Sequence, residues 1–333
     1  MPATIIPVSM NEKQVRIIYM GTPEFAIPPL KSLLEKGYNV VAVVTAPDKQ
    51  AGRGQKMQFP PVKAFALDHQ LKLFQPEKLR EESFVSNLKS LKPDLQVVVA
   101  FRMLPEVVWS IPSIGTFNLH ASLLPNYRGA APINRVIING EKETGLTTFF
   151  IDQHIDSGNI LLQRKVPVYD TDNAGTLHDR LMLEGAGLVI ETVDRLVAGE
   201  IRAVSQDTLM NDSDGIRTAP KITREDCRIN WDRPGKAVHN FIRGMTPYPG
   251  PYAYLSNEKG EHILFKFYET SFIPKAHRAD PGTVSTDNRT YLHIAVNDGW
   301  IAVHTLQQSG KRVMPLEEFL RGFSFKPFLP RFF

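Results

Sequence analysis

The 333-residue sequence predicts two domains: an α/β domain built on a doubly wound, mostly parallel sheet, and a smaller β-barrel that follows it. In the first two thirds, short apolar runs alternate with helical segments, as expected for parallel strands that are covered on both faces. Later strands are separated by turn sequences such as Glu258-Lys259-Gly260 and Asn297-Asp298-Gly299. Such spacing is typical of a small, mostly antiparallel barrel.

The first strand is expected at residues 15–20, where an apolar run ends at Gly21-Thr22-Pro23. Glu24-Phe25-Ala26 follows, so the full spacing of a dinucleotide phosphate loop is absent, and we expect a tight strand-to-helix turn instead of a nicotinamide site. Apolar residues at helical spacing predict a helix over 176–198. The other strands of this domain are expected at residues 39–45, 71–74, 94–101, 114–119, 147–151 and 160–168.

The predicted organisation is a short tail (1–12), a catalytic domain (13–205), a linker (206–225) and the barrel (226–333). The linker lies in a stretch from 199 to 225 in which Asp, Ser, Asn, Thr and Pro replace the apolar pattern. Aromatic residues gather at the C-terminal end, and we expect them to pack on the barrel rather than bind bases: Phe323, Phe325, Phe328, Phe332 and Phe333.

Composition is that of an ordinary globular protein, with 42% hydrophobic and 22% charged residues. No apolar run approaches the ~20 residues of a membrane-spanning helix, and the first ten residues lack the features of a signal peptide. Cys227 is the single cysteine, which excludes an internal disulfide and favours a reducing compartment, the cytoplasm. We expect a structural role for Cys227, no metal site at His154 or His178, and a monomer.

The net charge of +4 comes entirely from the C-terminal third. Residues 1–225 contain 25 basic and 25 acidic side chains, whereas residues 226–333 contain 14 and 10. A basic domain behind a neutral one suggests a polyanionic partner, because neutralised phosphates release counterions. An ordinary solvated surface is the alternative interpretation of so small an excess.

Asn118 and His120 form the most informative pair in the chain. They lie two residues apart at the end of an apolar strand, so their side chains share one face while Leu119 points the other way. Ligands of open parallel sheets bind at the carboxyl ends of strands. An isolated Asn-x-His can also be purely structural, but Asp156 on a glycine-containing turn adds a carboxylate that favours a protonated imidazole. Together these groups suit acyl-type transfer.

Four segments resemble the formyltetrahydrofolate-dependent formyltransferases: Asn118-Leu119-His120-Ala121-Ser122-Leu123-Leu124-Pro125, Tyr127-Arg128-Gly129-Ala130-Ala131-Pro132-Ile133, Glu143-Thr144-Gly145 and Asp156-Ser157-Gly158. Within that family, Arg128 to Pro132 and Ala51-Gly52-Arg53-Gly54-Gln55-Lys56 resemble the members that formylate methionyl-tRNA. The resemblance runs from about residue 15 to the C-terminus. It implies a Rossmann-like catalytic domain and an OB-like barrel.

The resemblance implies that Asn118, His120 and Asp156 are catalytic. The implied reaction moves the formyl group of 10-formyltetrahydrofolate to the α-amino group of methionine on initiator tRNA, for translation initiation. Negative charge develops on the formyl oxygen as the amine attacks. Asn118 and protonated His120 would donate to that oxygen, and Asp156 would keep His120 charged and help to move the amine proton.

The resemblance also implies a folate pocket lined by two segments, a lip after the strand at 94–101 and the turn after His120. Its residues would be Phe101, Arg102, Met103, Leu104, Ser122, Leu123, Leu124 and Pro125. The lip departs from the commoner family pattern, because it is one residue shorter and Phe101-Arg102 stands in place of Tyr-Gly. Ala121 stands where glycine is frequent.

Two basic regions are implied to contact tRNA, and each has a plainer interpretation. Residues 51–56 read as an exposed loop, but the resemblance implies that they reach the acceptor stem, where an arginine fork pairs well with phosphate. The last domain is implied to grip the tRNA body, although any one of its basic residues could be simply solvated. The residues concerned are Arg53, Lys56, Arg224, Arg228, Arg233, Lys236 and Arg243.

Three alternatives remain open from the sequence. The same chemistry could act on an amino sugar nucleotide, although the basic loop argues against it. A hydrolase of formylfolate would use water in place of the amine. An RNA-binding protein on an inactive enzyme fold is the third, and the intact set of Asn118, His120 and Asp156 argues against it.

Overall fold

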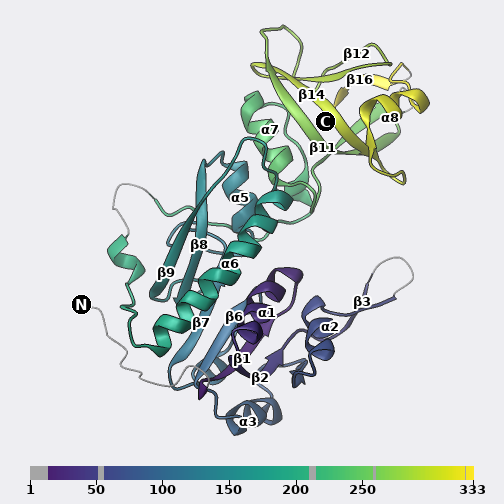
Figure 1. Ribbon diagram of the computed structural model, residues 1–333. Helices are drawn as coiled ribbons and strands as arrows, with labels where there is room; N and C mark the ends of the chain where they lie inside the picture. Colours follow the sequence, from purple (N-terminus) through teal and green to yellow (C-terminus); the bar gives the residue numbers. More distant parts are fainter. Residues whose placement is uncertain (1–13, 52–55, 210–214, 258–259, 327) are drawn as a thin grey trace. The chain divides into compact units, whose positions relative to one another are not determined.

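The computed structural model describes residues 14–51, 56–209, 215–257, 260–326 and 328–333 (Figure 1). The chain divides into two compact units, each of which is built from more than one stretch of sequence. The first unit contains residues 1–129, 143–167 and 178–218, and the second contains residues 130–142, 168–177 and 219–333.

The first unit is built on a seven-stranded sheet in the order β5-β2-β1-β6-β7-β8-β9. The five strands β1, β2, β5, β6 and β7 are parallel, and β8 runs antiparallel to both of its neighbours, β7 and β9. The doubly wound, mostly parallel sheet predicted from the sequence is therefore confirmed. The strands are β1 (Arg16–Gly21), β2 (Asn39–Val44), β5 (Leu73–Phe74), β6 (Leu95–Val99), β7 (Gly115–His120), β8 (Glu143–Phe150) and β9 (Ile160–Pro167).

Helices cover both faces of this sheet. On one face Ile18 and Val98 belong to a core that includes residues of α3 (Glu82–Ser90) and α4 (Glu106–Trp109). On the other, Leu119 lies under Gly185 of α6 (Ala174–Val197), where a Cβ would come within 2.8 Å of its side chain. Because Asn118 is the register partner of Val98, it shares the face of α3 and α4. The remaining helices of this unit include α1 (Ile27–Glu35) and α2 (Pro61–Asp68).

Two details of the first unit differ from the sequence-based expectation. Strand β8 begins at Glu143, four residues before the strand expected at 147–151, so Glu143-Thr144-Gly145 belongs to it. Glycine is required at 145 because a Cβ there would lie 2.2 Å from the Arg164 carbonyl oxygen of β9. The segment expected to be a loop at 51–56 is flanked by an antiparallel pair, β3 (Lys49–Ala51) and β4 (Lys56–Gln58).

The second unit is built on a nearly closed antiparallel sheet, in the order β12-β13-β14-β11-β10-β16 with β15 on β14. A bridge between Thr283 and Arg331 and the hydrogen bond from Phe332 N–H to Gly282 O join its two ends. The predicted barrel is thus confirmed. Its strands are β10 (Tyr252–Asn257), β11 (His262–Pro274), β12 (Val284–Thr286), β13 (Leu292–Val296), β14 (Gly299–Gln308), β15 (Met314–Pro315) and β16 (Phe328–Phe332).

The barrel core is rich in aromatic side chains. Trp231, Phe265 and Phe267 pack around Phe332, whose side chain is 1% exposed. Phe325 is also buried, and Phe323 packs against the same core, so the expectation that the aromatic tail packs on the barrel holds for these residues. The helices of this unit are α5 (Pro132–Ile138), α7 (Gly235–Gly244) and α8 (Leu316–Gly322).

Cys227 lies in the second unit beside this barrel. Its thiol is buried and donates to the Thr223 carbonyl oxygen at 3.2 Å. Burial, with the neighbouring Asp226, raises the pKa of the Cys227 thiol and disfavours the reactive thiolate. Among the described residues, no helix combines the length and apolar character that crossing a bilayer requires.

Candidate active site

Strand β7 brings Asn118 and His120 to the carboxyl edge of the sheet. Its parallel partner β6 ends at Val99, opposite Leu119, so the last residue of β7 stands at the open edge. Asn118 is half-buried, and its side chain has no hydrogen-bond partner among the described residues. The amide therefore has its donors available at the position where ligands of such sheets bind.

His120 is held by a backbone carbonyl on one side and faces a carboxylate on the other. Its side chain is buried, and Nε2 lies 2.8 Å from the Tyr127 carbonyl oxygen. A carbonyl only accepts, so Nε2 carries the hydrogen and donates it. The other nitrogen, Nδ1, is then the basic one in the neutral ring, and it lies 3.8 Å from Asp156 Oδ2. The structure thus brings His120 and Asp156 together.

Asp156 is fixed by its backbone and by its carboxylate. It has the left-handed conformation, with φ +53°. Oδ2 accepts the Gly129 N–H at 2.9 Å, which aims the carboxylate toward the loop that follows β7. The glycine at 158 lets the turn lie against β8, because a Cβ there would be 1.7 Å from the Phe150 carbonyl oxygen. This close approach is the physical reason for glycine in Asp156-Ser157-Gly158.

Gln206 is a buried residue of the site that the sequence analysis placed in the linker. Its side chain is 1% exposed and uses both ends of its amide. Nε2 donates to the carbonyl oxygens of Asp156 (2.9 Å) and Gly158 (2.8 Å). Oε1 accepts from Arg128 Nε (3.0 Å) and Nη2 (2.6 Å). Gln206 therefore joins the Asp156 turn to the loop that carries Tyr127 and Gly129.

The turn after His120 is satisfied internally. Thr147 Oγ1 donates to the Ser122 carbonyl oxygen at 2.7 Å and accepts the Leu124 N–H at 3.1 Å. Gln163 Nε2 donates to the Leu124 carbonyl oxygen at 2.8 Å. The side chains of Ser122, Leu124 and Pro125 are buried, and Leu123 is half-buried. Few hydrogen-bonding groups of this turn, which was expected to line a folate pocket, are therefore left to bind a ligand.

The lip at 101–104 has the opposite character. No backbone hydrogen bond involves these four residues among those described, so their amide and carbonyl groups are available. Leu104 is buried in the core and Phe101 packs beside it, whereas Met103 is 71% exposed. Arg102 turns away from solvent, because its guanidinium donates to the carbonyl oxygens of Pro76 and Glu77.

The residues expected to bind tRNA fall into three groups. Arg53 lies outside the described residues, and Lys56 begins β4. Arg224, Arg228, Arg233 and Lys236 are exposed on the second unit. Arg243 is different, because its side chain is 7% exposed in α7. It donates to Asn240 Oδ1 at 2.9 Å and to the Asp172 carbonyl oxygen at 2.8 Å, so its guanidinium is used inside the protein.

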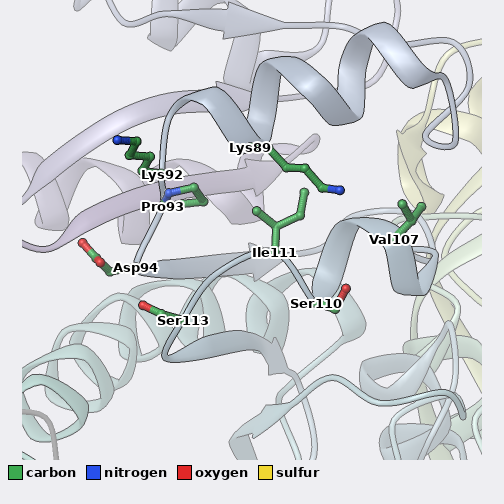
Figure 2. Close-up of a pocket in the computed structure, with 8 residues that line it drawn as sticks. All are labelled: Lys89, Lys92, Pro93, Asp94, Val107, Ser110, Ile111 and Ser113. Carbon is green, nitrogen blue, oxygen red and sulfur yellow. The ribbon is translucent and has the colours of Figure 1, made fainter.

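A hollow of about 520 Å³ lies at the opposite edge of the first sheet (Figure 2). Asp94 and Ser113, which precede β6 and β7, place it at the amino ends of these strands, away from His120. Asp94 Oδ2 accepts the Arg16 N–H at 2.8 Å, and the ammonium groups of Lys89 and Lys92 point in different directions. Its polar groups do not converge, so it is not the candidate site.

The chain is that of a formyl-group transferase. A family model described as "Formyl transferase" matches residues 13–193, and one described as "Formyl transferase, C-terminal domain" matches residues 221–324. A relative from Bacteroides fragilis, named methionyl-tRNA formyltransferase, is 52% identical over 314 residues, which cover 94% of this chain and 97% of the relative. One of the same name from Flavobacterium johnsoniae is 46% identical over 313 residues, covering 94% and 98%. The chain belongs to the methionyl-tRNA formyltransferase family.

A solved structure shares the fold at lower identity. It is an N-formyltransferase from Helicobacter canadensis in complex with folinic acid and dTDP-3-aminofucose. The two chains are 21% identical with a TM-score of 0.60, over 87% of this chain and 99% of the other. Among the described residues, no group of three or more His, Cys, Asp or Glu side chains is placed to hold a metal ion.

Replacing Gln206 by Leu should loosen the site from within the protein. We expect the free energy of unfolding to fall by about 2–4 kcal/mol, because Arg128 and two carbonyl groups lose buried partners. Urea denaturation measures this effect, and Asp207→Ala at the exposed neighbouring position is the control. Equal unfolding midpoints for Gln206→Leu and the unaltered protein would contradict the role assigned to Gln206.

Replacing Arg243 by Ala should affect stability first. The change removes the buried donor to Asn240 Oδ1 and to the Asp172 carbonyl oxygen, so we expect a loss of about 2–4 kcal/mol in the free energy of unfolding. The exposed Arg228→Ala should stay within about 0.5 kcal/mol in the same urea titration. An Arg243→Ala protein that is as stable as the unaltered protein but binds tRNA poorly would contradict this structural role and support the prediction that Arg243 binds tRNA.

Proposed function

We propose that this protein transfers the formyl group of 10-formyltetrahydrofolate to the α-amino group of methionine on initiator methionyl-tRNA. The observation that carries this proposal is the pairing of the His120 imidazole with the Asp156 carboxylate at the carboxyl edge of β7. Strand alternation places the Asn118 amide on the same face as His120, and no hydrogen bond to this amide occurs among the described residues. Membership of the methionyl-tRNA formyltransferase family supports the choice of acceptor.

Asn118 is the proposed donor to the formyl oxygen. The N–C bond forms as the methionyl amine attacks the formyl carbon, and negative charge accumulates on the formyl oxygen before the bond from that carbon to the folate nitrogen breaks. The Asn118 NH₂ group lies near the end of β7 and has no partner to give up among the described residues. Preorganised donors of this kind stabilise a developing oxyanion more than the ground state.

His120 is the proposed proton carrier, and Nδ1 is the nitrogen that acts. Nε2–H is committed to the Tyr127 carbonyl, so the neutral ring presents its lone pair at Nδ1. Nδ1 can accept the proton that the attacking amine loses, and the Asp156 carboxylate 3.8 Å away stabilises the resulting imidazolium. The protonated Nδ1 can then donate to the formyl oxygen or return the proton to the folate nitrogen that leaves.

The formyl donor fits the lip better than the turn. When bound, 10-formyltetrahydrofolate supplies the activated formyl group. The free backbone groups of 101–104 can hydrogen-bond its polar ring, and the exposed Met103 offers apolar contact. The Helicobacter canadensis enzyme was solved with folinic acid, a related folate, which supports this class of donor. The turn after His120 then contributes mainly to the shape of the proposed pocket, through Ser122, Leu123, Leu124 and Pro125.

The proposed acceptor is held by groups outside the catalytic trio. We propose that Arg53 and Lys56 contact the acceptor stem, and that exposed basic residues of the second unit bind the tRNA body through its phosphates. Those residues are Arg224, Arg228, Arg233 and Lys236. We further propose that the protein acts as a monomer in the cytoplasm.

One assay tests the proposed function against its alternatives. The protein is incubated with 10-formyltetrahydrofolate and either methionyl-tRNA or amino sugar nucleotides, and formyl incorporation and free formate are followed. We expect formyl-methionyl-tRNA. Formylated sugar with unreacted tRNA would assign the activity to an amino sugar enzyme, and formate release without an acceptor would indicate a hydrolase.

Replacing Asn118 by Ala should lower kcat by about 10²–10³, because one donor to the oxyanion is lost. The Kd for the folate should change little, since the amide acts mainly on the transition state. Single-turnover kinetics and folate titration measure the two effects, and Asn87→Ala on the exposed side of α3 is the matched control. Unchanged turnover in Asn118→Ala would defeat the assignment.

Replacing Arg53 by Ala should raise the KM for methionyl-tRNA by about tenfold, because the change removes the proposed phosphate contact. The folate affinity should stay constant, because the proposed folate-binding residues are unaltered. Arg80→Ala, an exposed arginine of the same unit, is the control for loss of charge. Identical rates for Arg53→Ala and the unaltered protein at every tRNA concentration would remove this loop from the site.

A further inference from the structure

The last two phenylalanines of the chain point in opposite directions. Phe332 is 1% exposed in the barrel core, whereas Phe333 is 38% exposed. Two hydrogen bonds fix the position of Phe333, because its N–H donates to the Tyr254 carbonyl oxygen at 3.0 Å and its carbonyl accepts the Tyr254 N–H at 2.9 Å. Strand alternation therefore directs the Phe333 ring to the outside of the barrel.

An arginine and two further rings surround Phe333. The Arg228 guanidinium carbon lies 5.6 Å from the ring centroid of Phe333. Tyr254 is stacked on Phe333 at 6.0 Å between centroids, and His262 meets the ring edge at 5.0 Å. We call Arg228, Tyr254, His262 and Phe333 the Arg228 platform. All four belong to the second unit.

Arg228 is an exposed cation whose guanidinium lies over the Phe333 ring. The backbone at Arg228 is held against Tyr252 by the hydrogen bond from Ile229 N–H to the Tyr252 carbonyl oxygen at 2.8 Å. No carboxylate among the described residues forms an ion pair with Arg228. The nearby Asp226 carboxylate is occupied by the N–H and the hydroxyl of Thr223, at 2.8 and 2.9 Å.

A guanidinium that rests on a ring keeps its N–H edge free. The aromatic face restricts the side chain without consuming its donors, so the planar fork is ordered before a ligand arrives. A phosphate diester matches that fork in charge and geometry. An acidic protein segment would be attracted as well, but a basic second unit in a methionyl-tRNA formyltransferase favours RNA.

We propose that the Arg228 platform is a phosphate-binding point for the tRNA backbone, in which Phe333 is a positioning residue that acts through Arg228. This inference rests on the proposed function, and it assigns the affinity to one ordered arginine instead of to the general basic character of the unit. Phe333 and Arg228 should consequently behave as one energetic unit.

The test uses the full-length protein and methionyl-tRNA, with Kd measured from 50 to 300 mM KCl. Arg228→Ala should raise the Kd about tenfold and reduce the slope of log Kd against log salt by about 1, because one phosphate contact is lost. Phe333→Leu should raise the Kd about threefold and leave the slope unchanged, because the charge remains. The double variant should bind no more weakly than Arg228→Ala alone.

Two matched controls separate this effect from instability and bulk charge. Phe332→Leu alters the adjacent buried ring and should lower thermal stability without raising the Kd of the folded protein. Arg321→Ala removes an exposed charge from α8 and should change the Kd less than twofold. An equal loss in Arg321→Ala would overturn the proposal, because the effect would then be general electrostatics.

The remaining outcomes distinguish this inference from the proposed function. If the protein formylates methionyl-tRNA but Arg228→Ala binds it normally, the platform is refuted and the function stands. If the unaltered protein neither binds nor formylates methionyl-tRNA, the function itself fails. Additive effects in the double variant would refute the positioning role of Phe333. If Arg228→Ala lowers the affinity for polyglutamate more than the affinity for tRNA, the platform would be assigned to an acidic protein.

Discussion

Gln206 constrains two loops that strand pairing alone leaves independent. The loop after β7 carries the Tyr127 carbonyl, which fixes the His120 ring, and the turn after β8 carries Asp156. Gln206 bonds to both, through Arg128 on one side and through two carbonyl oxygens on the other. Because its amide is buried, each of these bonds is expensive to break. The distance between Nδ1 of His120 and the Asp156 carboxylate therefore depends on a residue that touches neither group.

Two arginines that look alike in the sequence differ in their exposure to solvent. Arg228 and Arg243 both lie in the basic C-terminal third, each among apolar neighbours. Arg243 is buried in α7 and satisfies carbonyl oxygens, and burial lowers the pKa of its guanidinium from the ordinary value. Arg228 lies on a ring at the surface, and no group in the described part of the chain accepts a hydrogen bond from its guanidinium. A count of basic residues therefore overstates the surface available to a polyanion.

The sequence predicted the parts of the fold that follow from local pattern. The buried parallel strands and the long helix α6 were expected within a few residues of where they lie, and so were Asn118 and His120 at the end of a strand. The parts it missed depend on contacts between distant segments. Gly145 lies outside the strand expected at 147–151, yet it belongs to β8, and glycine is needed there because the neighbouring strand comes too close for a side chain. Gln206 stands in a polar stretch, and only tertiary structure shows that this one side chain is buried.

The division of labour between the two units follows from the reach of the interactions involved. Oxyanion stabilisation and proton transfer act over hydrogen-bond distances, so the proposed mechanism confines them to the edge of β7 and makes them independent of what carries the amine. Recognition of a tRNA depends on phosphates spread over a much larger surface, to which a basic barrel can contribute. If the proposed roles of Asn118, His120 and Asp156 hold, acceptor choice can change through the surface outside these three residues while the chemistry at the formyl carbon stays the same.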